Sequence, residues 1–431
     1  MIQETNFRRI FINTRLLMLM LIGFSCSDHL DIENKNKYIE ISDDRTVVLY
    51  INADNNLDGN SRHNTKSILK GMVGIGQRVV VYVDSRYSEP CLMTVVVRQD
   101  TCIYDTVMRY DELNSSAPST ITKVLTDVKD LFPAESYGLF LWSHATAWLP
   151  EYGDYSFVSS GRSVNYSRSI LNNDVNVDDY WVPIHWSDDN ELPLTKTFGL
   201  DEHLGENTDT YGNSKETNIV DLAKALPYEF EFIVIDACLM SSVEVLYELK
   251  DKASYIIASP VEILASGMPY SKIMSYLWSD ENDLMKICDE FYKLYNSETS
   301  NAHEHSGVIS LIKTAGLSNL ANATKLVIAD AEYKDLGVSD IRRYPMANFA
   351  SNVFYDLRNL VENFADSEKL NYFNACLDDV VLYKRSTKYY WEKEYDASKY
   401  SGISTYIPLE RWKSQNSYYS NFKWAQDVYG F

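Results

Sequence analysis

The stretch FIVIDACLMSSVEV, Phe232–Val245, decides the fold class. Its apolar run is continuous and does not alternate, which is typical of a strand in a sheet that is covered on both faces. The run ends at Asp236, and Cys238 follows two residues later. In open α/β sheets, ligands bind at the carboxyl ends of the strands. The sequence therefore places a carboxylate and a thiol where a parallel sheet has its binding site.

A helix is expected directly after Cys238. Ser241 and Glu244 have the S-x-x-E spacing of a capping box, in which both side chains satisfy free backbone N–H groups at the start of a helix. A helix N-terminus stabilises nearby negative charge and so favours thiolate over thiol. Cys238 is therefore a candidate nucleophile. The alternative is a buried structural cysteine, which is the commoner role of a single cysteine.

Strand-like and helix-like segments alternate through the first two thirds of the chain. The predicted strands are Thr46–Asn52, Arg78–Val83, Leu92–Arg98, Tyr137–Ser143, Glu231–Asp236 and Ser254–Ser259. The predicted helices are Asn64–Met72, Ser119–Leu131, Asn218–Leu226 and Ser242–Leu249. This alternation predicts an α/β fold with a mostly parallel central sheet.

Two regions depart from the alternation. Trp148–Phe198 is about fifty residues rich in Tyr, Asp, Asn and Ser, and loops of that length are usually functional or mobile. After Tyr270 the pattern is mainly helical, with late strand candidates at Asp379–Tyr383 and Gly402–Pro408. We expect residues 46–275 to form the core and residues 276–431 a C-terminal helical subdomain; the alternative is that the latter add layers to the same sheet.

The N-terminus has the features of an export signal. Arg8, Arg9 and Arg15 precede the apolar run Leu16–Phe24, which is too short to span a membrane. Cys26 follows the run, as in a bacterial lipoprotein signal, where this thiol is acylated. We therefore expect a signal peptide at residues 1–25 and a flexible tether at 26–45. The alternative is a plain cleaved signal with an incidental cysteine.

The charge balance and the cysteine count limit what the chain can bind and how its thiols can pair. The 431 residues carry 61 acidic and 40 basic side chains, a formal net charge of −21, which argues against nucleic acid. With Cys26 acylated, five cysteines remain, so at least one thiol is free. Cys91 and Cys102 flank a strand-like segment; they are either a pair or, more in keeping with their apolar surroundings, two buried thiols.

A second predicted strand ends in a chemically useful residue. In SYGLFLWSHATAW, His144 follows an apolar run and is itself followed by small residues. A cysteine nucleophile needs an imidazole to take its proton and later to protonate the leaving amine. If the two strands are neighbours, His144 and Cys238 reach one crevice. The alternative for His144 is a hydrogen-bonded loop histidine.

These motifs carry a family resemblance. The pair WSHATAW and IDACLMSSVEV resembles the clostripain family, peptidase family C11, whose members are cysteine peptidases of caspase-like fold. Further agreement lies in YINADNNLD, TFGLDEH, NIVDLAKALP, ASPVEILASGMPY, GVISLIKTAGLSNLANA and GISTYIPLE, so the resemblance covers roughly Thr46 to Glu410. It implies a caspase-like α/β/α sandwich and a lipoprotein form similar to those of Bacteroidota, whose tethers are also acidic.

The resemblance also assigns roles. It implies Cys238 as nucleophile, His144 as general base and acid, and the backbone N–H groups of Ala145 and Cys238 as oxyanion donors. Ala145 departs from the family, which usually has glycine there. Clostripain-like enzymes cleave after Arg or Lys, and Asp236 matches the acid that is thought to line their basic-residue pocket; the alternative is a structural Asp at the strand end.

Two further observations qualify the expected specificity and cofactors. Family members often carry acids directly after Ser259, where this chain has Pro260 and Val261 and only Glu262 as a substitute. Asp54–Gly59 (DNNLDG) matches the start of a calcium loop but lacks the later glutamate, which favours turn chemistry over a calcium ion. We expect no metal or other cofactor, with calcium as the open alternative.

The sequence thus predicts a lipid-anchored cysteine endopeptidase that acts on protein or peptide substrates. We expect a monomer that is attached through its N-terminal lipid to the bacterial outer membrane, at the cell surface or periplasmic face. Processing at an internal basic residue occurs in some relatives, and Arg162 and Arg168 are candidates here. The alternative function is a catalytically degenerate peptidase fold that binds peptide or glycan.

Overall fold

The computed structural model describes residues 41–98, 100–149, 157–159, 162–164, 198–201, 216–297, 305–329, 331, 333, 340–345, 353–390, 393–410 and 413–431. The expected signal peptide, with Cys26, and most of the expected tether lie outside these residues. In the described part of the chain, no helix combines the length and the apolar content needed to cross a membrane.

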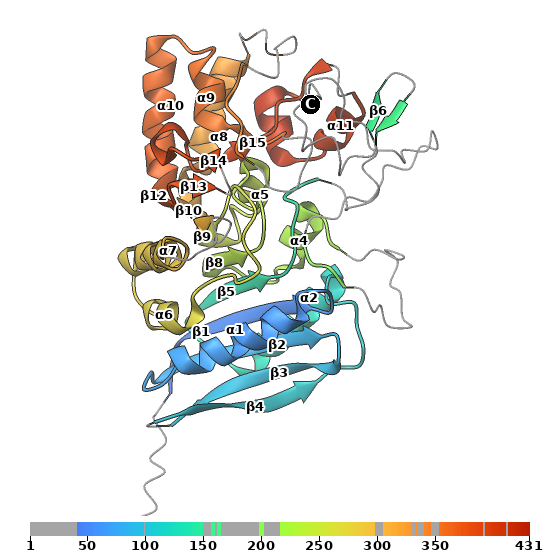
Figure 1. The fold of residues 1–431 in the computed structure, drawn as a ribbon, viewed down its shortest axis with the longest axis vertical. Coiled ribbons are helices and arrows are strands. Elements are labelled where there is room, and N and C mark those ends of the chain that lie inside the picture. The colour runs from blue at the N-terminus through green and yellow to red at the C-terminus, as the bar shows by residue number, and fades with distance from the viewer. Residues whose placement is uncertain are drawn as a thin grey trace, which may run out of the picture. The chain divides into compact units, whose positions relative to one another are not determined.

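A nine-stranded sheet runs through the described chain in the order β12-β10-β9-β8-β5-β1-β2-β3-β4 (Figure 1). The bounds of these strands are β1 Ser42–Ala53, β2 Gln77–Ser85, β3 Ser88–Val97, β4 Cys102–Arg109, β5 Ser136–Trp142, β8 Phe230–Asp236, β9 Ala253–Ala258, β10 Val308–Lys313 and β12 Val381–Ser386. The five central strands from β2 to β9 pair in parallel. Because β3 and β10 pair antiparallel with both neighbours, only these two run the other way. The mostly parallel sheet is confirmed.

Helices cover both faces of the sheet (Figure 1). On one face the apolar side chains of β1 at Val47, Leu49 and Ile51 pack with α1 Asp58–Gly71, α6 Tyr270–Ile273 and α7 Glu281–Tyr295. On the other, Val48 and Tyr50 belong to a core shared with α2 Pro118–Leu131, α4 Ile219–Ala225, α5 Val243–Glu248, α8 Leu317–Ile328, α9 Leu357–Glu362 and α10 Ser367–Val380. Both faces of β1 are buried, which explains its continuous apolar run. The expected α/β/α sandwich is confirmed.

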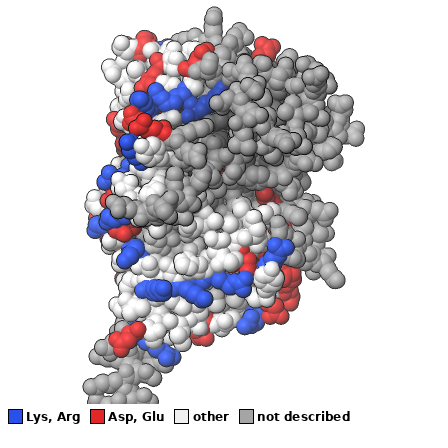
Figure 2. Space-filling view, viewed as in Figure 1, with Lys and Arg blue, Asp and Glu red and all other residues white. Residues whose placement is uncertain are grey.

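Smaller elements complete the described chain. The short strands are β6 Phe157–Ser159, β7 Arg162–Val164, β11 Tyr355–Asp356, β13 Tyr389–Tyr390, β14 Lys393–Glu394 and β15 Ser404–Thr405. Helical turns and a last helix are η2 Met274–Tyr276, η4 Thr314–Gly316, η6 Ala397–Lys399, α11 Lys413–Tyr419 and η8 Ala425–Tyr429. Figure 2 shows one face of the molecule, on which Lys and Arg are interspersed with Asp, Glu and neutral side chains.

The ten predicted core strands and helices are all present, with ends shifted by a few residues. Strands β4 and β10 were not predicted. Most side chains of β4 are exposed or half-buried, so it has little apolar signal, whereas β10 is a short buried run that periodicity alone cannot separate from a helix.

The two late strand predictions need correction. Asp379–Tyr383 is partly helical, since α10 continues to Val380 before β12 begins. Only Ser404–Thr405 of Gly402–Pro408 is a strand, because Ser404 N–H donates to the Ser241 carbonyl and draws this segment onto the turn before α5.

Residues Lys37–Phe431 form one compact unit. Strands from both sides of the expected boundary at residue 276 share the central sheet, since β10 and β12 lie beside β9. The separate C-terminal subdomain stays a prediction. All five cysteines of the described residues are free thiols, and Cys91 and Cys102 lie at opposite ends of the β3–β4 hairpin.

Candidate active site

Strands β5 and β8 end side by side. They pair in parallel, and the last pair in their register joins Trp142 to Asp236. His144 and Cys238 each follow two residues beyond that pair. The expectation that the two strands are neighbours is therefore confirmed, and both side chains belong to the carboxyl edge of the sheet, where ligands bind in this class of fold.

The Cys238 thiol is held by a loop that follows β9. Its sulfur accepts a hydrogen bond from the Ile263 N–H at 3.3 Å and lies 3.7 Å from the Ile263 carbonyl oxygen. Burial raises the pKa of the Cys238 thiol to about 12, and the nearby Glu262 carboxylate adds to the rise, while the Ile263 N–H opposes it. The thiol is therefore neutral at pH 7 in this state.

The predicted capping box is wrong. The N-cap of α5 is Ser242, whose side chain accepts from the Val245 N–H, whereas the Ser241 hydroxyl donates to the Gly402 carbonyl. Glu244 accepts from the Tyr406 N–H and the Tyr419 hydroxyl, at 2.9 Å each, and so anchors the C-terminal segment. The helix thus begins one residue later than expected, and the capping role falls to Ser242.

His144 has a partner that sequence reasoning missed. Its Nε2 lies 2.6 Å from the Asn56 side-chain oxygen Oδ1. Because an amide oxygen accepts, Nε2 carries the proton in this assignment and Nδ1 keeps its lone pair as a base. Asn56 lies in the DNNLDG stretch, which reaches the site because β1 and β5 are neighbours. The sequence offered one signal for Asn56 as a site residue, which is its position shortly after a central strand of the sheet.

Ala145 fits the backbone of its loop without strain. The left-handed residue of this loop is Ala147, with φ of 60°, and Ala145 itself is not in that region. Ala145 lies opposite Phe198 in an isolated bridge, and the Gly199 N–H donates to the His144 carbonyl at 3.0 Å. The departure from glycine therefore puts no backbone strain on Ala145 itself, whose N–H lies in the loop after β5, next to the strand that leads to Cys238.

Asp236 is buried, and one of its two carboxylate oxygens accepts hydrogen bonds from the protein. Its Oδ2 accepts from the Met268 N–H at 3.0 Å and from the Tyr270 hydroxyl at 2.8 Å. Gly267, with φ of +65°, lies so close that a Cβ there would come within 2.5 Å of Oδ2. Burial raises the pKa of Asp236 to about 6, against the effect of these two donors. Within the described residues, its second oxygen, Oδ1, receives no hydrogen bond.

Glu262 lies near Cys238 but is engaged. It is buried, and its carboxylate accepts a hydrogen bond from the Tyr390 hydroxyl. Its charge raises the pKa of Cys238, which places it in the electrostatic surroundings of the thiol. The structure therefore groups Cys238, Asp236 and Glu262 around the turn after β8 and the loop after β9. His144 and Ala145 lie in the loop after the neighbouring strand, β5.

Two other predicted features are only partly described. Trp148 and Phe198, at the two ends of the long segment, are buried in the core. Arg162 begins the short strand β7, and Arg168 lies outside the described residues. Processing at either arginine therefore stays a prediction.

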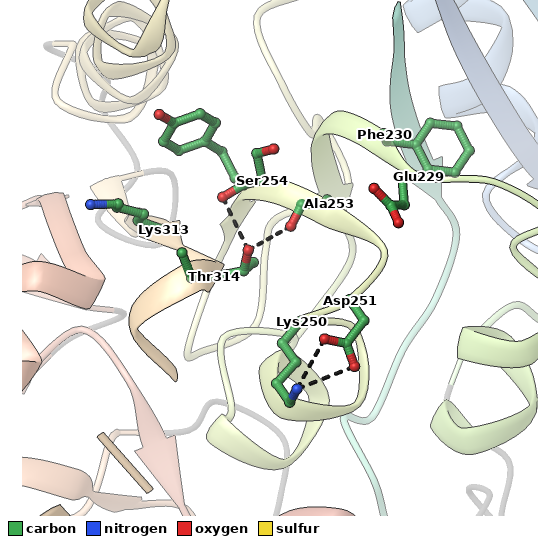
Figure 3. A pocket seen from close by; sticks show the side chains of 10 residues that line it. Glu229, Phe230, Lys250, Asp251, Ala253, Ser254, Lys313 and Thr314 are labelled. Atoms are coloured by element: carbon green, nitrogen blue, oxygen red, sulfur yellow. Dashed lines mark hydrogen bonds and ion pairs between the residues drawn. The ribbon is translucent and has the colours of Figure 1, made fainter. Parts of the chain in front are cut away.

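A depression of 420 Å³ lies away from this site, at the edge where β8 and β9 begin (Figure 3). Its lining includes Phe230 and Ala253, the first residues of those strands, and the ion pair between Lys250 and Asp251 at 2.9 Å. The carboxyl edge with Cys238 is at the other end of the same strands. The depression therefore takes no part in chemistry at Cys238.

An open sheet between two helical layers, with a cysteine and a histidine beyond neighbouring strands, defines a caspase-like cysteine hydrolase. The sequence model of the clostripain family matches residues 49–179 and 185–430. The chain belongs to the clostripain family, and it is a cysteine protease. A search of curated proteins gave no significant match.

Solved structures agree in fold. An inactive zymogen of a C11 protease from Parabacteroides distasonis is 29% identical, with 90% of this chain and 99% of that chain covered and a TM-score of 0.69. A secreted C11 cysteine protease from Bacteroides thetaiotaomicron, in complex with an irreversible peptide inhibitor, is 27% identical with the same coverage and TM-score. The caspase-like fold and the family resemblance are confirmed.

Proposed function

We propose that this chain is a secreted, lipid-anchored cysteine endopeptidase that uses a dyad of Cys238 and His144 and cleaves after Arg or Lys. The observation that carries the proposal is the pairing of Trp142 with Asp236, because it sets the two strand ends side by side. Each strand then supplies one member of the dyad at the same distance beyond the pair.

In the proposed reaction, Cys238 gives its thiol proton to His144, and the thiolate bonds to the scissile carbonyl carbon. The N–H groups of Ala145 and Cys238 stabilise the oxygen that becomes negative, each contributing about 2.7–4 kcal/mol. His144 then gives the proton to the leaving amine as the C–N bond breaks. A water molecule, deprotonated by His144, releases the acyl group from the sulfur.

We infer that the described state precedes activation, because burial keeps the Cys238 thiol neutral in it. The pKa of Cys238 at about 12 must fall before the thiol is an effective nucleophile, and a protonated imidazole beside it lowers the pKa of a thiol. The Parabacteroides distasonis relative was solved as an inactive zymogen. We infer a similar precursor here, which is cut after a basic residue of the long segment; Arg162 and Arg168 are candidates.

The pocket for the basic residue is proposed at Asp236. Its buried carboxylate suits a guanidinium or ammonium group, because charge-assisted hydrogen bonds are about twice as strong as neutral ones. Oδ2 is occupied by Met268 and Tyr270, which leaves Oδ1 for the substrate. Glu262 is the second acid, held by Tyr390, and we expect it to contribute less.

For location, we propose acylation of Cys26 and attachment to the outer membrane, at the cell surface or the periplasmic face. The Bacteroides thetaiotaomicron relative is described as secreted, which supports export. Cys26→Ser in the full chain should move the protein from the membrane fraction to the soluble one; retention in the membrane would rule out this anchor.

The second candidate is a peptide-binding protein of degenerate catalytic site. The observation that favours this second function is the neutral Cys238 thiol, whose sulfur accepts a hydrogen bond from the Ile263 N–H. Such a protein would have a thiol that reacts slowly with iodoacetamide even after nicking of the chain, whereas an activated peptidase would react quickly at Cys238.

The deciding experiment is a panel of fluorogenic peptides with Arg, Lys or a neutral residue at the cleaved position. The full chain is assayed before and after limited nicking by trypsin, and the trypsin is blocked with a serine-protease inhibitor because it shares the expected specificity. Cleavage after Arg or Lys that starts only after nicking supports both the peptidase and the precursor. Absence of cleavage in both states would favour the binding protein.

Asn56 gives a prediction about the positioning of His144. Asn56→Ala removes the hydrogen bond to Nε2, and since the pair is solvent-exposed we expect kcat/KM to fall by only about 3- to 10-fold. Asn56→Asp keeps an acceptor and should restore activity, with the acid limb of the pH profile moved because a carboxylate stabilises the imidazolium. Equal losses in both variants would contradict this role.

A further inference from the structure

Both hydrogen bonds of the Asp236 carboxylate go to the same oxygen. The Tyr270 hydroxyl donates to Oδ2 at 2.8 Å, and the Met268 N–H donates to the same atom at 3.0 Å. An ionised carboxylate has about four acceptor sites spread over its two oxygens, so nothing in the group itself requires this asymmetry. The two donors lie on one side of Asp236 because the loop after β9 and the start of α6 pack there.

The Tyr270 side chain is fixed by its surroundings. It is fully buried, and its ring packs against Phe140 of β5 with 5.8 Å between the ring centroids. The backbone at Tyr270 approaches α1 so closely that a Cβ added at Gly71 would come within 2.8 Å of the Tyr270 carbonyl oxygen. A buried hydroxyl without a partner is costly, so the Tyr270 hydroxyl keeps its bond to Oδ2.

These contacts set the plane of the Asp236 carboxylate. The two oxygens are chemically equivalent, so the donors do not select one of them by name; they hold one oxygen toward Tyr270 and so direct the other away from it. Gly267 limits rotation further, since a Cβ there would come within 2.5 Å of Oδ2. Without the Tyr270 hydroxyl, the Met268 N–H alone would hold the group, and its plane could turn.

We propose that Tyr270 is a positioning residue for substrate recognition, which holds Oδ2 of Asp236 and so directs Oδ1 toward the basic side chain of the cleaved residue. The proposal rests on the function proposed above for Asp236 in the pocket. It adds a residue that does not touch the substrate and acts through Asp236.

Tyr270 also favours the charged form of Asp236. Burial raises the pKa of Asp236 to about 6, while the Met268 N–H and the Tyr270 hydroxyl lower it. Among the described residues, the titratable side chains that interact electrostatically with Asp236 are Tyr270, Tyr295 and Cys238, and burial raises the pKa of each, so all three are neutral at pH 6. Loss of the Tyr270 hydroxyl should therefore raise the pKa of Asp236.

Tyr295 provides a matched control. It is the last residue of α7 and, like Tyr270, a buried tyrosine of the same apolar core. Its hydroxyl donates to the Gly267 carbonyl at 2.7 Å, so its partner is the backbone and not the carboxylate. Replacement by phenylalanine removes one buried hydroxyl at either position and keeps the ring. Only Tyr270→Phe removes a donor to Asp236.

The first test uses the nicked chain with trypsin blocked, from pH 5 to pH 9. It follows the ratio of kcat/KM for a peptide with Arg at the cleaved position to kcat/KM for the same peptide with a neutral residue there, because the ratio cancels the ionisation of the dyad. In wild type the ratio should fall below about pH 6. In Tyr270→Phe the fall should begin at about pH 7, and the ratio at pH 9 should be about 3- to 10-fold lower. Tyr295→Phe should keep the wild-type midpoint.

The second test needs no catalysis and compares Tm of the full chain at pH 5 and pH 8. A hydrogen bond to a charged carboxylate is stronger than one to a neutral carboxyl group, so Tyr270→Phe should lose more stability where Asp236 is ionised. We expect its drop in Tm relative to wild type to be roughly 2 °C larger at pH 8 than at pH 5. The drop in Tyr295→Phe should be the same at both pH values.

Asp236→Asn, assayed in parallel, separates this proposal from the proposed function. If Asp236→Asn lowers the Arg-to-neutral ratio while Tyr270→Phe matches Tyr295→Phe in both tests, the pocket stands and the role of Tyr270 is overturned. If Asp236→Asn leaves the ratio unchanged, the pocket itself is wrong and Tyr270 has no such role. A raised midpoint confined to Tyr270→Phe, with a larger drop in Tm at pH 8, supports the proposal.

Discussion

Replacing Cys238 with alanine should lower kcat for a peptide with Arg at the cleaved position on the order of 10⁴-fold or more, because it removes the proposed nucleophile that forms the acyl intermediate. The fold should survive, since the described bonds of the thiol are two weak sulfur contacts with Ile263. The measurement is kcat of nicked wild type and variant, with trypsin blocked, together with Tm of both chains.

A matched control is available within the chain. Cys376 is also a partly exposed free thiol, on α10, and Cys376→Ala should keep full activity. The same pair of variants separates the sites of alkylation, because iodoacetamide should inactivate wild type and Cys376→Ala alike. Full hydrolysis by Cys238→Ala would overturn the dyad and point to another nucleophile.

The strands that carry the proposed dyad could be predicted because their physical signal is local. β5 and β8 are buried on both faces, so each is a continuous apolar run that ends sharply in polar or small residues. The resemblance to a family then gave roles to His144 and Cys238. That the two strands are neighbours was only an expectation, because the order of strands in a sheet depends on crossover connections that the sequence does not reveal. The parallel pairing of β5 with β8 in the structure shows that they are neighbours.

The contacts made by the turn after β8 could not be predicted. Ser241 and Glu244 have the spacing of a capping box, but Leu239 takes a left-handed φ of 68°, and the helix begins one residue later than expected. Glu244 is then used by Tyr406 and Tyr419, more than 150 residues away. Tertiary hydrogen bonds have overridden a local motif, because the C-terminal segment supplies donors that no local pattern reveals.

Asn56 shows the same limit. It lies just beyond the end of β1, a correctly predicted strand, so its place at the carboxyl edge of the sheet could be expected from the sequence. Its partner comes from another strand, because Asn56 contacts His144 in the loop after β5. Pairs of polar side chains at one sheet edge need the strand order before they can be proposed.

Asp236→Asn tests the pocket and has the second largest expected effect. We expect kcat/KM for Arg and Lys substrates to fall about 10²- to 10³-fold, because a buried cation would lose its paired charge. Substrates with a neutral residue at that position should change little. The amide oxygen can still accept from Met268 and Tyr270, and the variant should be at least as stable at neutral pH, since burial disfavours the charged form of Asp236.

The pH dependence gives an independent check of the same residue. The pKa of Asp236 is raised to about 6, so its carboxylate is charged above that pH and becomes protonated below it. In wild type, kcat/KM for Arg substrates should therefore fall as the pH drops through about 6, beyond any fall seen with neutral substrates. Asp236→Asn should lose this extra limb. Glu262→Gln is the control, and it should keep the limb because its carboxylate is already held by Tyr390. If Asp236→Asn lowered kcat/KM equally for all substrates, Asp236 would be a structural residue that holds Met268 and Tyr270, and the specificity would lie elsewhere.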